Sequence, residues 1–280
     1  MSSPKILASG WGAITPADAG WTYISFAVHT VAAGETIPIP NDHQEHALVP
    51  LSGTASVEAD EQSWKLGGRA NVFEGLGWCL YLPRDTAATV TAVSDLELAI
   101  GGAPATTRHA PVLVNPDDTA IELRGGGNAS RQVNSLMLPD FPADRLHVIE
   151  VWTPGGNWSS YPPHKHEQDR DGEAQLEETY YYRLRDPENG WAVQRVYSPD
   201  RDNFDLVQTV RDGDLLLIPW GYHTTVAAHG HDLYYLNILA GPAPKRTLQA
   251  FQDPCLKPTQ DEWPAAGIDP RLPFMSRYPN

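Results

Sequence analysis

The segment Tyr161-Pro-Pro-His-Lys-His-Glu167, followed by Glu178-Thr-Tyr-Tyr-Tyr-Arg183, has the pattern of two β-strands that carry metal ligands. Alternate residues of a strand share a face, so His164 and His166 point the same way. The run after Glu178 is aromatic and strand-prone, which places this carboxylate where a second strand begins. Two imidazole nitrogens and one carboxylate oxygen suit a divalent ion such as zinc, manganese or iron. The segment therefore predicts a metal site that needs one more ligand.

The chain on both sides of this segment is predicted to be almost entirely β-strand. Runs of strand-forming residues, separated by Gly, Pro and polar turns, recur at the spacing of a sandwich or barrel. One such run, His46 to Leu51, is expected to end in a turn at Ser52-Gly53. Helical periodicity of useful length is missing from the sequence. The fold class is therefore all-β.

The two halves of the sequence repeat the same features in the same order. Strands ending in Leu82-Pro83 and Ile218-Pro219 are each followed by a strand that leads to a Gly-Ala-Pro or Ala-Gly-Pro turn. This indicates an internal duplication of one all-β unit. Prolines and the run Arg124-Gly-Gly-Gly-Asn128 separate the halves. We expect an N-terminal domain in residues 1–105, a Pro/Gly-rich linker in residues 106–142 and a C-terminal domain in residues 143–280.

Composition limits the partners and the location of the protein. The formal net charge of the 280 residues is −15 and the sequence pI is about 4.9, which argues against nucleic acid or an anionic membrane as a partner. Cys79 and Cys255 lie far apart and are read as reduced thiols. The N-terminus lacks the pattern of a secretory signal, and no run approaches the roughly 18 apolar residues of a membrane span. The cytoplasm is the expected location.

A candidate for the missing ligand is His223. The segment Gly213-Asp-Leu-Leu-Leu-Ile-Pro219-Trp-Gly221-Tyr-His223 reads as a turn, an apolar strand and a Pro-x-Gly turn that delivers a histidine. His164, His166, Glu178 and His223 together resemble the two signature motifs of the cupin superfamily, which place three histidines and one glutamate inside a small jelly-roll barrel. Here eleven residues separate His166 from Glu178, more than in most cupins.

Longer segments resemble one branch of that superfamily, the 5-deoxy-glucuronate isomerase family of myo-inositol catabolism, whose members contain two cupin barrels. The resemblance covers nearly the whole chain. It rests on SSYPPHKHE (159–167), LEETYYYR (176–183), AVQRVYSPDR (192–201), the long segment at 211–242, DPRLP (269–273), HALVPLSGTASV (46–57), GGRANVFEG (67–75) and ELRGGGNASRQV (122–133).

The resemblance implies a metal-dependent aldose–ketose isomerase that converts 5-deoxy-D-glucuronate to 5-dehydro-2-deoxy-D-gluconate. It also implies one divalent ion per chain, with zinc as first choice, in the C-terminal cupin. The N-terminal half has no His-x-His and no histidine soon after Pro83, so we expect its cupin to be metal-free. Proton transfer and a hydride shift both remain open as mechanisms. By strand parity with Glu178 we expect Tyr182 to position substrate or transfer a proton, or else to line the cup. Arg195, in an otherwise apolar strand, is the candidate for binding the substrate carboxylate.

Two other functions remain open from the sequence. One is catalytic: a related uronate isomerase of the 5-keto-4-deoxyuronate type, or more distantly an iron-dependent cupin dioxygenase. The other is a non-catalytic bicupin that binds a sugar acid. The expected partner is a small uronic acid substrate. Exposed strand edges predict that the protein is a homo-oligomer.

Overall fold

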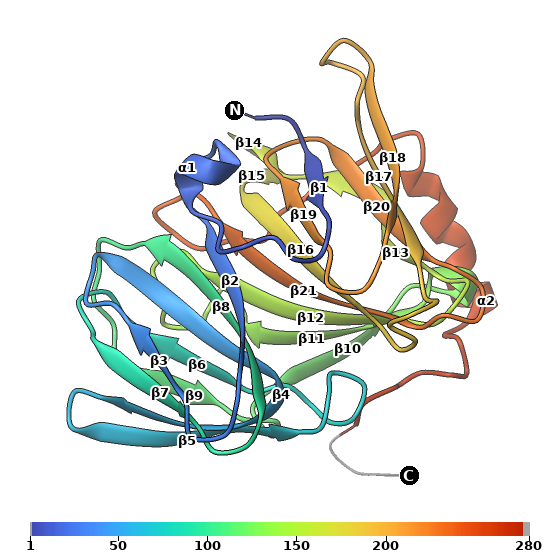
Figure 1. Cartoon of the computed structure of the whole chain (residues 1–280). Coiled ribbons are helices and arrows are strands. Elements are labelled where there is room, and N and C mark those ends of the chain that lie inside the picture. The colour runs from blue at the N-terminus through green and yellow to red at the C-terminus, as the bar shows by residue number, and fades with distance from the viewer. Residues whose placement is uncertain (1, 277–280) are drawn as a thin grey trace.

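The computed structural model describes residues 2–276, and nearly all of its regular structure is β-strand (Figure 1). The predicted all-β class is confirmed. Within residues 2–276 no helix is long and apolar enough to cross a membrane. The helical turns are α1 (Pro16–Ala19), η1 (Gly127–Ala129), η2 (Lys257–Glu262) and α2 (Trp263–Ala266).

The first half of the chain forms an N-terminal unit whose interior is filled by apolar side chains. Strand β3, for example, buries Ile37 and Ile39 and exposes the residues between them, as its alternating sequence requires. Leu48, Val57 and Leu66 belong to the same apolar cluster. The strands of this unit are β2 (Ser25–Val31), β3 (Thr36–Ile39), β4 (Gln44–Ala59), β5 (Gln62–Arg69), β6 (Cys79–Leu82), β7 (Ala88–Ala92), β8 (Leu96–Pro104) and β9 (Val112–Val114).

The second half forms a C-terminal unit of two sheets and a small hairpin. The seven-stranded sheet has the order β1-β19-β16-β21-β12-β11-β10, the five-stranded sheet has the order β18-β17-β20-β13-β22, and β14 pairs with β15. The strands are β1 (Lys5–Leu7), β10 (Ala120–Arg124), β11 (Arg131–Met137), β12 (His147–Thr153), β13 (Trp158–Lys165), β14 (Glu167–Arg170), β15 (Glu173–Gln175), β16 (Glu177–Leu184), β17 (Ala192–Ser198), β18 (Phe204–Val210), β19 (Leu215–Ile218), β20 (Tyr222–Ala227), β21 (Leu233–Ala240) and β22 (Phe251–Gln252).

The two units pair their strands in the same order, as an internal duplication requires. The path β2-β8-β4-β6-β9 corresponds to β12-β21-β16-β19-β1, and the path β3-β7-β4-β5 corresponds to β13-β20-β17-β18. One long strand, β4, takes part in both sheets of the N-terminal unit, whereas the C-terminal unit uses two strands, β16 and β17, for the same positions. The turn expected at Ser52-Gly53 is therefore wrong. The backbone continues there as strand, with Gly53 at a φ of 81° and a shift of register toward β5.

Each unit contains a strand that comes from the other unit's stretch of sequence. β1, which precedes the N-terminal unit, pairs with β19 of the C-terminal unit. β9, which precedes the C-terminal unit, pairs with β6 of the N-terminal unit. The predicted linker at residues 106–142 contains the strands β9, β10 and β11. Its prolines and glycines mark turns between short strands, and β10 is a mostly exposed strand.

Two carboxylates, the buried Glu45 and the half-buried Glu177, link the two units in matching positions. Glu45 in β4 accepts hydrogen bonds from the backbone N–H groups of residues 144–146, which precede β12. Glu177 in β16 accepts them from residues 22–24, which precede β2. Each glutamate thus fixes the entry of the other unit's first strand by charge-assisted hydrogen bonds.

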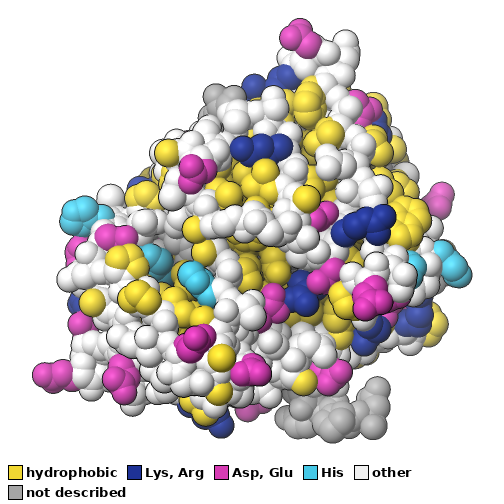
Figure 2. Space-filling view, in the orientation of Figure 1, with side chains coloured by type: hydrophobic (Ala, Val, Ile, Leu, Met, Phe, Trp, Pro, Cys, Tyr) yellow, Lys and Arg dark blue, Asp and Glu magenta, His cyan; other side chains and the backbone are white. Residues whose placement is uncertain are grey.

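The largest apolar cluster lies between the two units and draws on both. It includes Phe26 and Tyr81 from the N-terminal unit, and Trp152 and Leu236 from the C-terminal unit. On the face drawn in Figure 2, acidic side chains are scattered over both units with basic ones between them, so the surface does not separate into an acidic and a basic half.

The protein should become less stable as the pH is lowered, because of His147 at the start of β12. Its side chain is buried, and burial together with the nearby Arg246 guanidinium lowers its pKa to about 3. In the unfolded chain a histidine binds a proton below about pH 6.5, whereas in the folded protein this one stays neutral. The free energy of unfolding should therefore decrease as the pH falls from about 6.5, by roughly 2 kcal/mol at pH 5 from this residue.

Urea unfolding of the wild type and of His147→Gln at pH 7 and pH 5 checks this expectation. For each protein, the free energy of unfolding at pH 5 is subtracted from that at pH 7. The other buried histidines contribute equally to both differences, so the wild type should lose more stability than His147→Gln by the contribution of His147. An equal loss of stability in the two proteins would show that His147 does not cause the pH dependence.

Candidate metal centre

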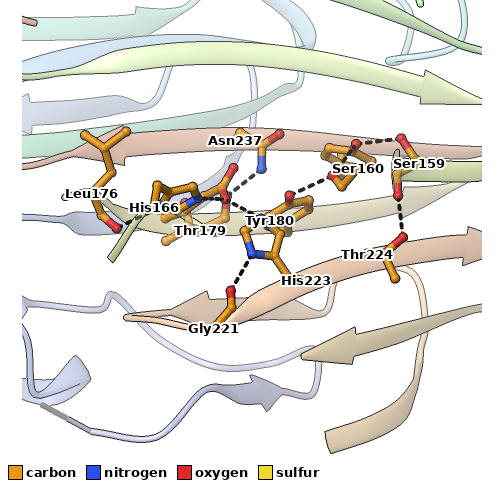
Figure 3. Close-up of polar contacts among 12 residues, drawn as sticks. Ser159, Ser160, His166, Leu176, Thr179, Tyr180, Gly221, His223, Thr224 and Asn237 are labelled. Carbon is orange, nitrogen blue, oxygen red and sulfur yellow. Dashed lines mark hydrogen bonds and ion pairs between the residues drawn. The ribbon is translucent and has the colours of Figure 1, made fainter. Parts of the chain in front are cut away.

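Two of the four predicted ligands face each other on neighbouring strands of the five-stranded sheet. His164 in β13 is directly opposite His223 in β20. His166 follows β13, and Glu178 comes from β16 of the seven-stranded sheet. The cluster therefore lies between the two sheets of the C-terminal unit, and Figure 3 shows His166 and His223 side by side.

The three histidines form a compact group, and Glu178 contacts two of them. One ligand atom from each of the three histidines lies within 4.8 Å of the other two. The Nε2 atoms of His166 and His223 lie 2.9 and 3.2 Å from Oε2 of Glu178. The structure thus brings together all four residues that the sequence singled out.

Backbone carbonyl groups fix the orientation of two of the imidazoles. Nδ1 of His166 lies 2.9 Å from the carbonyl oxygen of Leu176, and Nδ1 of His223 lies 3.0 Å from that of Gly221 (Figure 3). An Nδ1–H that donates to a carbonyl leaves the Nε2 lone pair free to face the cluster. Gly221 has a φ of 100°, and a Cβ there would lie 3.1 Å from Val196 Cγ1, so the turn before His223 favours glycine.

The chemistry of the donor set fits a divalent metal ion. Nε2 of His223 is buried, and its polar neighbour is Oε2 of Glu178 at 3.2 Å, an oxygen that it shares with Nε2 of His166. Two buried imidazole nitrogens that face one carboxylate oxygen form an arrangement that a metal ion would stabilise. Burial, with the neighbouring His223 and His166, lowers the pKa of His164 well below its usual value and keeps it neutral, as a ligand must be. Three imidazole nitrogens and one carboxylate oxygen suit zinc, manganese or iron.

Glu178 carries the negative charge of the cluster. Burial alone would raise its pKa, but hydrogen bonds with His166 and His223 outweigh burial and lower it to about 2. Burial lowers the pKa of His166, yet the hydrogen bond and charge of Glu178 reverse this and raise it overall. Glu178 therefore stays ionised and available as an anionic ligand.

The cluster opens into a cavity of about 510 Å³ between the two sheets. Tyr180 and Tyr235 line it, with the Tyr180 ring centroid 5.8 Å from that of His223. The Tyr180 and Tyr235 hydroxyls lie 2.8 and 3.3 Å from Oγ of Ser160. Ser159 adds a further hydroxyl, 2.7 Å from that of Tyr235. A connected row of hydroxyl groups therefore borders the candidate metal site.

The structure does not bring Tyr182 to this cavity. Its side chain is fully buried in the apolar core of the unit, and its hydroxyl donates to Oε1 of Gln194 at 2.7 Å. Tyr182 lies on the same face of β16 as Glu178, as predicted, but it is two residues beyond Tyr180 and so farther from the histidines. Tyr180 occupies the position beside the histidines instead.

Arg195 points away from the cluster, to the outer face of the five-stranded sheet. It forms a two-point ion pair with Asp205 at 2.9 and 2.7 Å and lies over the Tyr197 ring. It lines a different cavity, of about 630 Å³, between that face and the C-terminal segment. The neighbouring Gln194 and Val196 are buried, so Arg195 has the outward parity.

Sequence reasoning missed the cavity residues from the predicted linker, among them the buried Arg131 in β11. A strand signal was present in Arg131-Gln-Val-Asn-Ser-Leu-Met137, where residues 131, 133 and 135 share a face. The glycine run immediately before it suggested a loop instead.

The repeated strand order and a three-histidine, one-glutamate cluster between two sheets define a protein of the cupin class. Within that class, the chain belongs to the KduI/IolB family, whose model matches residues 8–258.

Relatives of known name agree with this assignment. The chain is 41% identical over 244 residues to the 5-deoxy-glucuronate isomerase of Geobacillus thermodenitrificans, covering 86% of this chain and 88% of that protein. It is 37% identical over 245 residues to the enzyme of the same name from Bacillus subtilis, covering 86% and 89%.

Solved structures show the same relationship. An IolB-like protein from Salmonella typhimurium superimposes with a TM-score of 0.84 at 38% identity, covering 91% of this chain and 97% of that one. Bacillus subtilis oxalate decarboxylase superimposes with a TM-score of 0.63 at 13% identity, covering 87% and 79%, which shows a shared fold.

Proposed function

We propose that this chain catalyses the isomerisation of 5-deoxy-D-glucuronate to 5-dehydro-2-deoxy-D-gluconate, a step of myo-inositol degradation. The observation that carries the proposal is the 41% identity to a 5-deoxy-glucuronate isomerase over 86% of the chain. The three-histidine, one-glutamate cluster beside a cavity supports it, because aldose–ketose isomerisation needs polarised oxygen atoms on adjacent carbons.

In this proposal His164, His166, Glu178 and His223 hold one divalent ion, with zinc as first choice and manganese or iron as alternatives. A bound ion supplies a Lewis acid that polarises the substrate carbonyl and stabilises developing negative charge. The carbonyl groups of Leu176 and Gly221 keep two of the imidazoles in place, so the ligands are positioned before any ion arrives.

The hydroxyl groups of Ser160, Tyr180 and Tyr235 are assigned to the substrate's own hydroxyls. Each hydroxyl can donate or accept a hydrogen bond. When a substrate carbonyl becomes a hydroxyl group, or the reverse, these side chains can therefore stay hydrogen-bonded. Asn237, whose Nδ2 donates to the carbonyl oxygen of Thr179 at 3.1 Å, holds its side chain on the same cavity wall. These four residues would orient the sugar chain against the cluster.

The test is anaerobic incubation of metal-loaded protein with 5-deoxy-D-glucuronate in D₂O, followed by NMR. We expect loss of the aldehyde signal and formation of the 2-ketose without oxygen. Solvent deuterium in the product would indicate proton transfer, and its absence a hydride shift. An aldehyde signal that persists would contradict the proposal, and turnover that requires oxygen would favour a dioxygenase.

A related uronate isomerase of the 5-keto-4-deoxyuronate type is the second candidate, because the matched family is described by two names, KduI and IolB. Comparing kcat/KM for the two substrates separates them, and we expect the higher value for 5-deoxy-D-glucuronate. Turnover of neither substrate, combined with tight binding of uronic acids, would favour a non-catalytic sugar-acid-binding protein. Homo-oligomer formation and cytoplasmic location remain predictions.

A further inference from the structure

Arg131 lies at the far end of the cavity from the candidate metal ligands. It is the first residue of β11, and its side chain lines the same cavity as His164 and Glu178. Strands β16, β21, β12 and β11 are successive antiparallel neighbours. The start of β11 is therefore at the opposite end of the sheet from the start of β16, where Glu178 lies.

The guanidinium group of Arg131 is buried without an anionic partner. The residue is only 6% exposed. Nη1 donates to the carbonyl oxygen of Ala129 at 3.0 Å, and the group lies 5.7 Å from the Trp263 ring centre. No carboxylate within residues 2–276 forms an ion pair with it. Burial lowers the pKa of Arg131 to about 10, as expected of a desolvated cation.

The other cations near the site are already neutralised. Arg124, which also lines the cavity, pairs with Glu122 at 2.9 and 2.6 Å. Lys165 pairs with Glu167 at 2.8 Å and with Glu173 at 2.9 Å. Of the described arginines and lysines that line this cavity, Arg131 alone lacks a carboxylate.

We propose that Arg131 binds the carboxylate of the uronic acid substrate and so determines the specificity of the site for acids over neutral sugars; this rests on the proposed function. The planar guanidinium forms paired hydrogen bonds with a carboxylate. In a protein with a net charge of −15, an anionic substrate needs such a local cation.

The layout of the cavity matches the substrate. The aldehyde at C1 and the carboxylate at C6 are at opposite ends of the sugar chain. The ligand cluster and Arg131 are likewise at opposite ends of the cavity, with the hydroxyl groups of Tyr180 and Tyr235 between them. Both tyrosines line the same cavity as Arg131. A sugar bound with C1 at the cluster therefore directs C6 toward Arg131.

The test compares Arg131→Gln with Arg195→Gln on two substrates. One is 5-deoxy-D-glucuronate and the other is the same aldose with a hydroxymethyl group at C6. For Arg131→Gln we expect KM for the uronate to rise by at least about 30-fold. The kcat/KM for the neutral aldose should change by less than about threefold. Arg195→Gln, which removes an outward-facing cation, should change neither, and Arg131→Lys should recover part of the loss.

An equal loss on both substrates would show that Arg131 only supports Ala129 and Trp263, and would overturn the inference. An unchanged KM for the uronate would overturn it as well. If the wild type does not turn over 5-deoxy-D-glucuronate, the proposed function fails, and the inference is then tested by calorimetric titration with D-glucuronate. Binding by the wild type that is lost in Arg131→Gln supports a uronate site. Equal binding by both proteins, or binding by neither, overturns it.

Discussion

Replacing His223 with alanine should remove the bound metal ion and lower turnover by at least about 10²-fold, because loss of even an outer contact to a metal ligand commonly costs 10- to 100-fold. The Nε2 atom of His223 is buried and lies 3.2 Å from Oε2 of Glu178. Its removal leaves a three-residue ligand set with a gap on the β20 side. The fold should persist, because the core of the unit consists of apolar residues such as Val196, Leu216 and Ile218.

His229→Ala is the matched control, since His229 is exposed in the loop after β20 and does not belong to the cluster. Metal content by elemental analysis, kcat for the uronate and the circular dichroism spectrum should be unchanged in the control. In His223→Ala the spectrum should be preserved while metal and activity are lost. Normal metal content and turnover in His223→Ala would exclude His223 as a ligand.

Replacing Arg69 with methionine should destabilise the protein by about 3–5 kcal/mol, the usual effect of removing one partner from a buried ion pair. Arg69 of the N-terminal unit and Glu150 of the C-terminal unit are both buried, with Nη2 2.7 Å from Oε1. Tyr234 also donates to Oε1 of Glu150, at 2.8 Å. Without Arg69, the Glu150 carboxylate stays buried with only that hydroxyl group as partner.

The double variant Arg69→Met/Glu150→Leu provides the control, because removing both charges leaves no unpaired ion. We expect it to be markedly more stable than Arg69→Met in chemical denaturation monitored by tryptophan fluorescence. Losses that simply add, with the double variant the least stable, would show that the pair does not couple the two units. A loss below about 1 kcal/mol in Arg69→Met would show the same.

Much of the fold and most of the ligand cluster could be predicted from local patterns. The spacing of His164 and His166 fixes a shared face on one strand, and the apolar run before Pro219 places His223 after a buried strand. These inferences need only the two-residue period of a strand and the chemistry of glycine and proline turns. The four residues singled out from the sequence lie at or near the ends of strands, where the strand and turn patterns are local.

The features that could not be predicted from the sequence depend on which strands become neighbours in the fold. The exchange of β1 and β9 between units has no local signal, because both strands are three residues long. Arg195 was chosen for its apolar surroundings, but only the pairing of β17 with β18 and β20 shows which side of that strand faces inward. Arg131 was overlooked because its strand follows a glycine-rich turn, and its unpaired charge is evident only once the surrounding sheet is built.

Metal reconstitution tests the central claim most directly, namely that His164, His166, Glu178 and His223 hold an ion that isomerisation requires. Protein stripped with a chelator is titrated with zinc, manganese or iron(II) while conversion of 5-deoxy-D-glucuronate is followed by NMR. We expect the stripped protein to be inactive and activity to return in proportion to bound ion, reaching its maximum at one ion per chain. Full turnover by the stripped protein, or ion binding at these residues that restores no activity, would contradict the account.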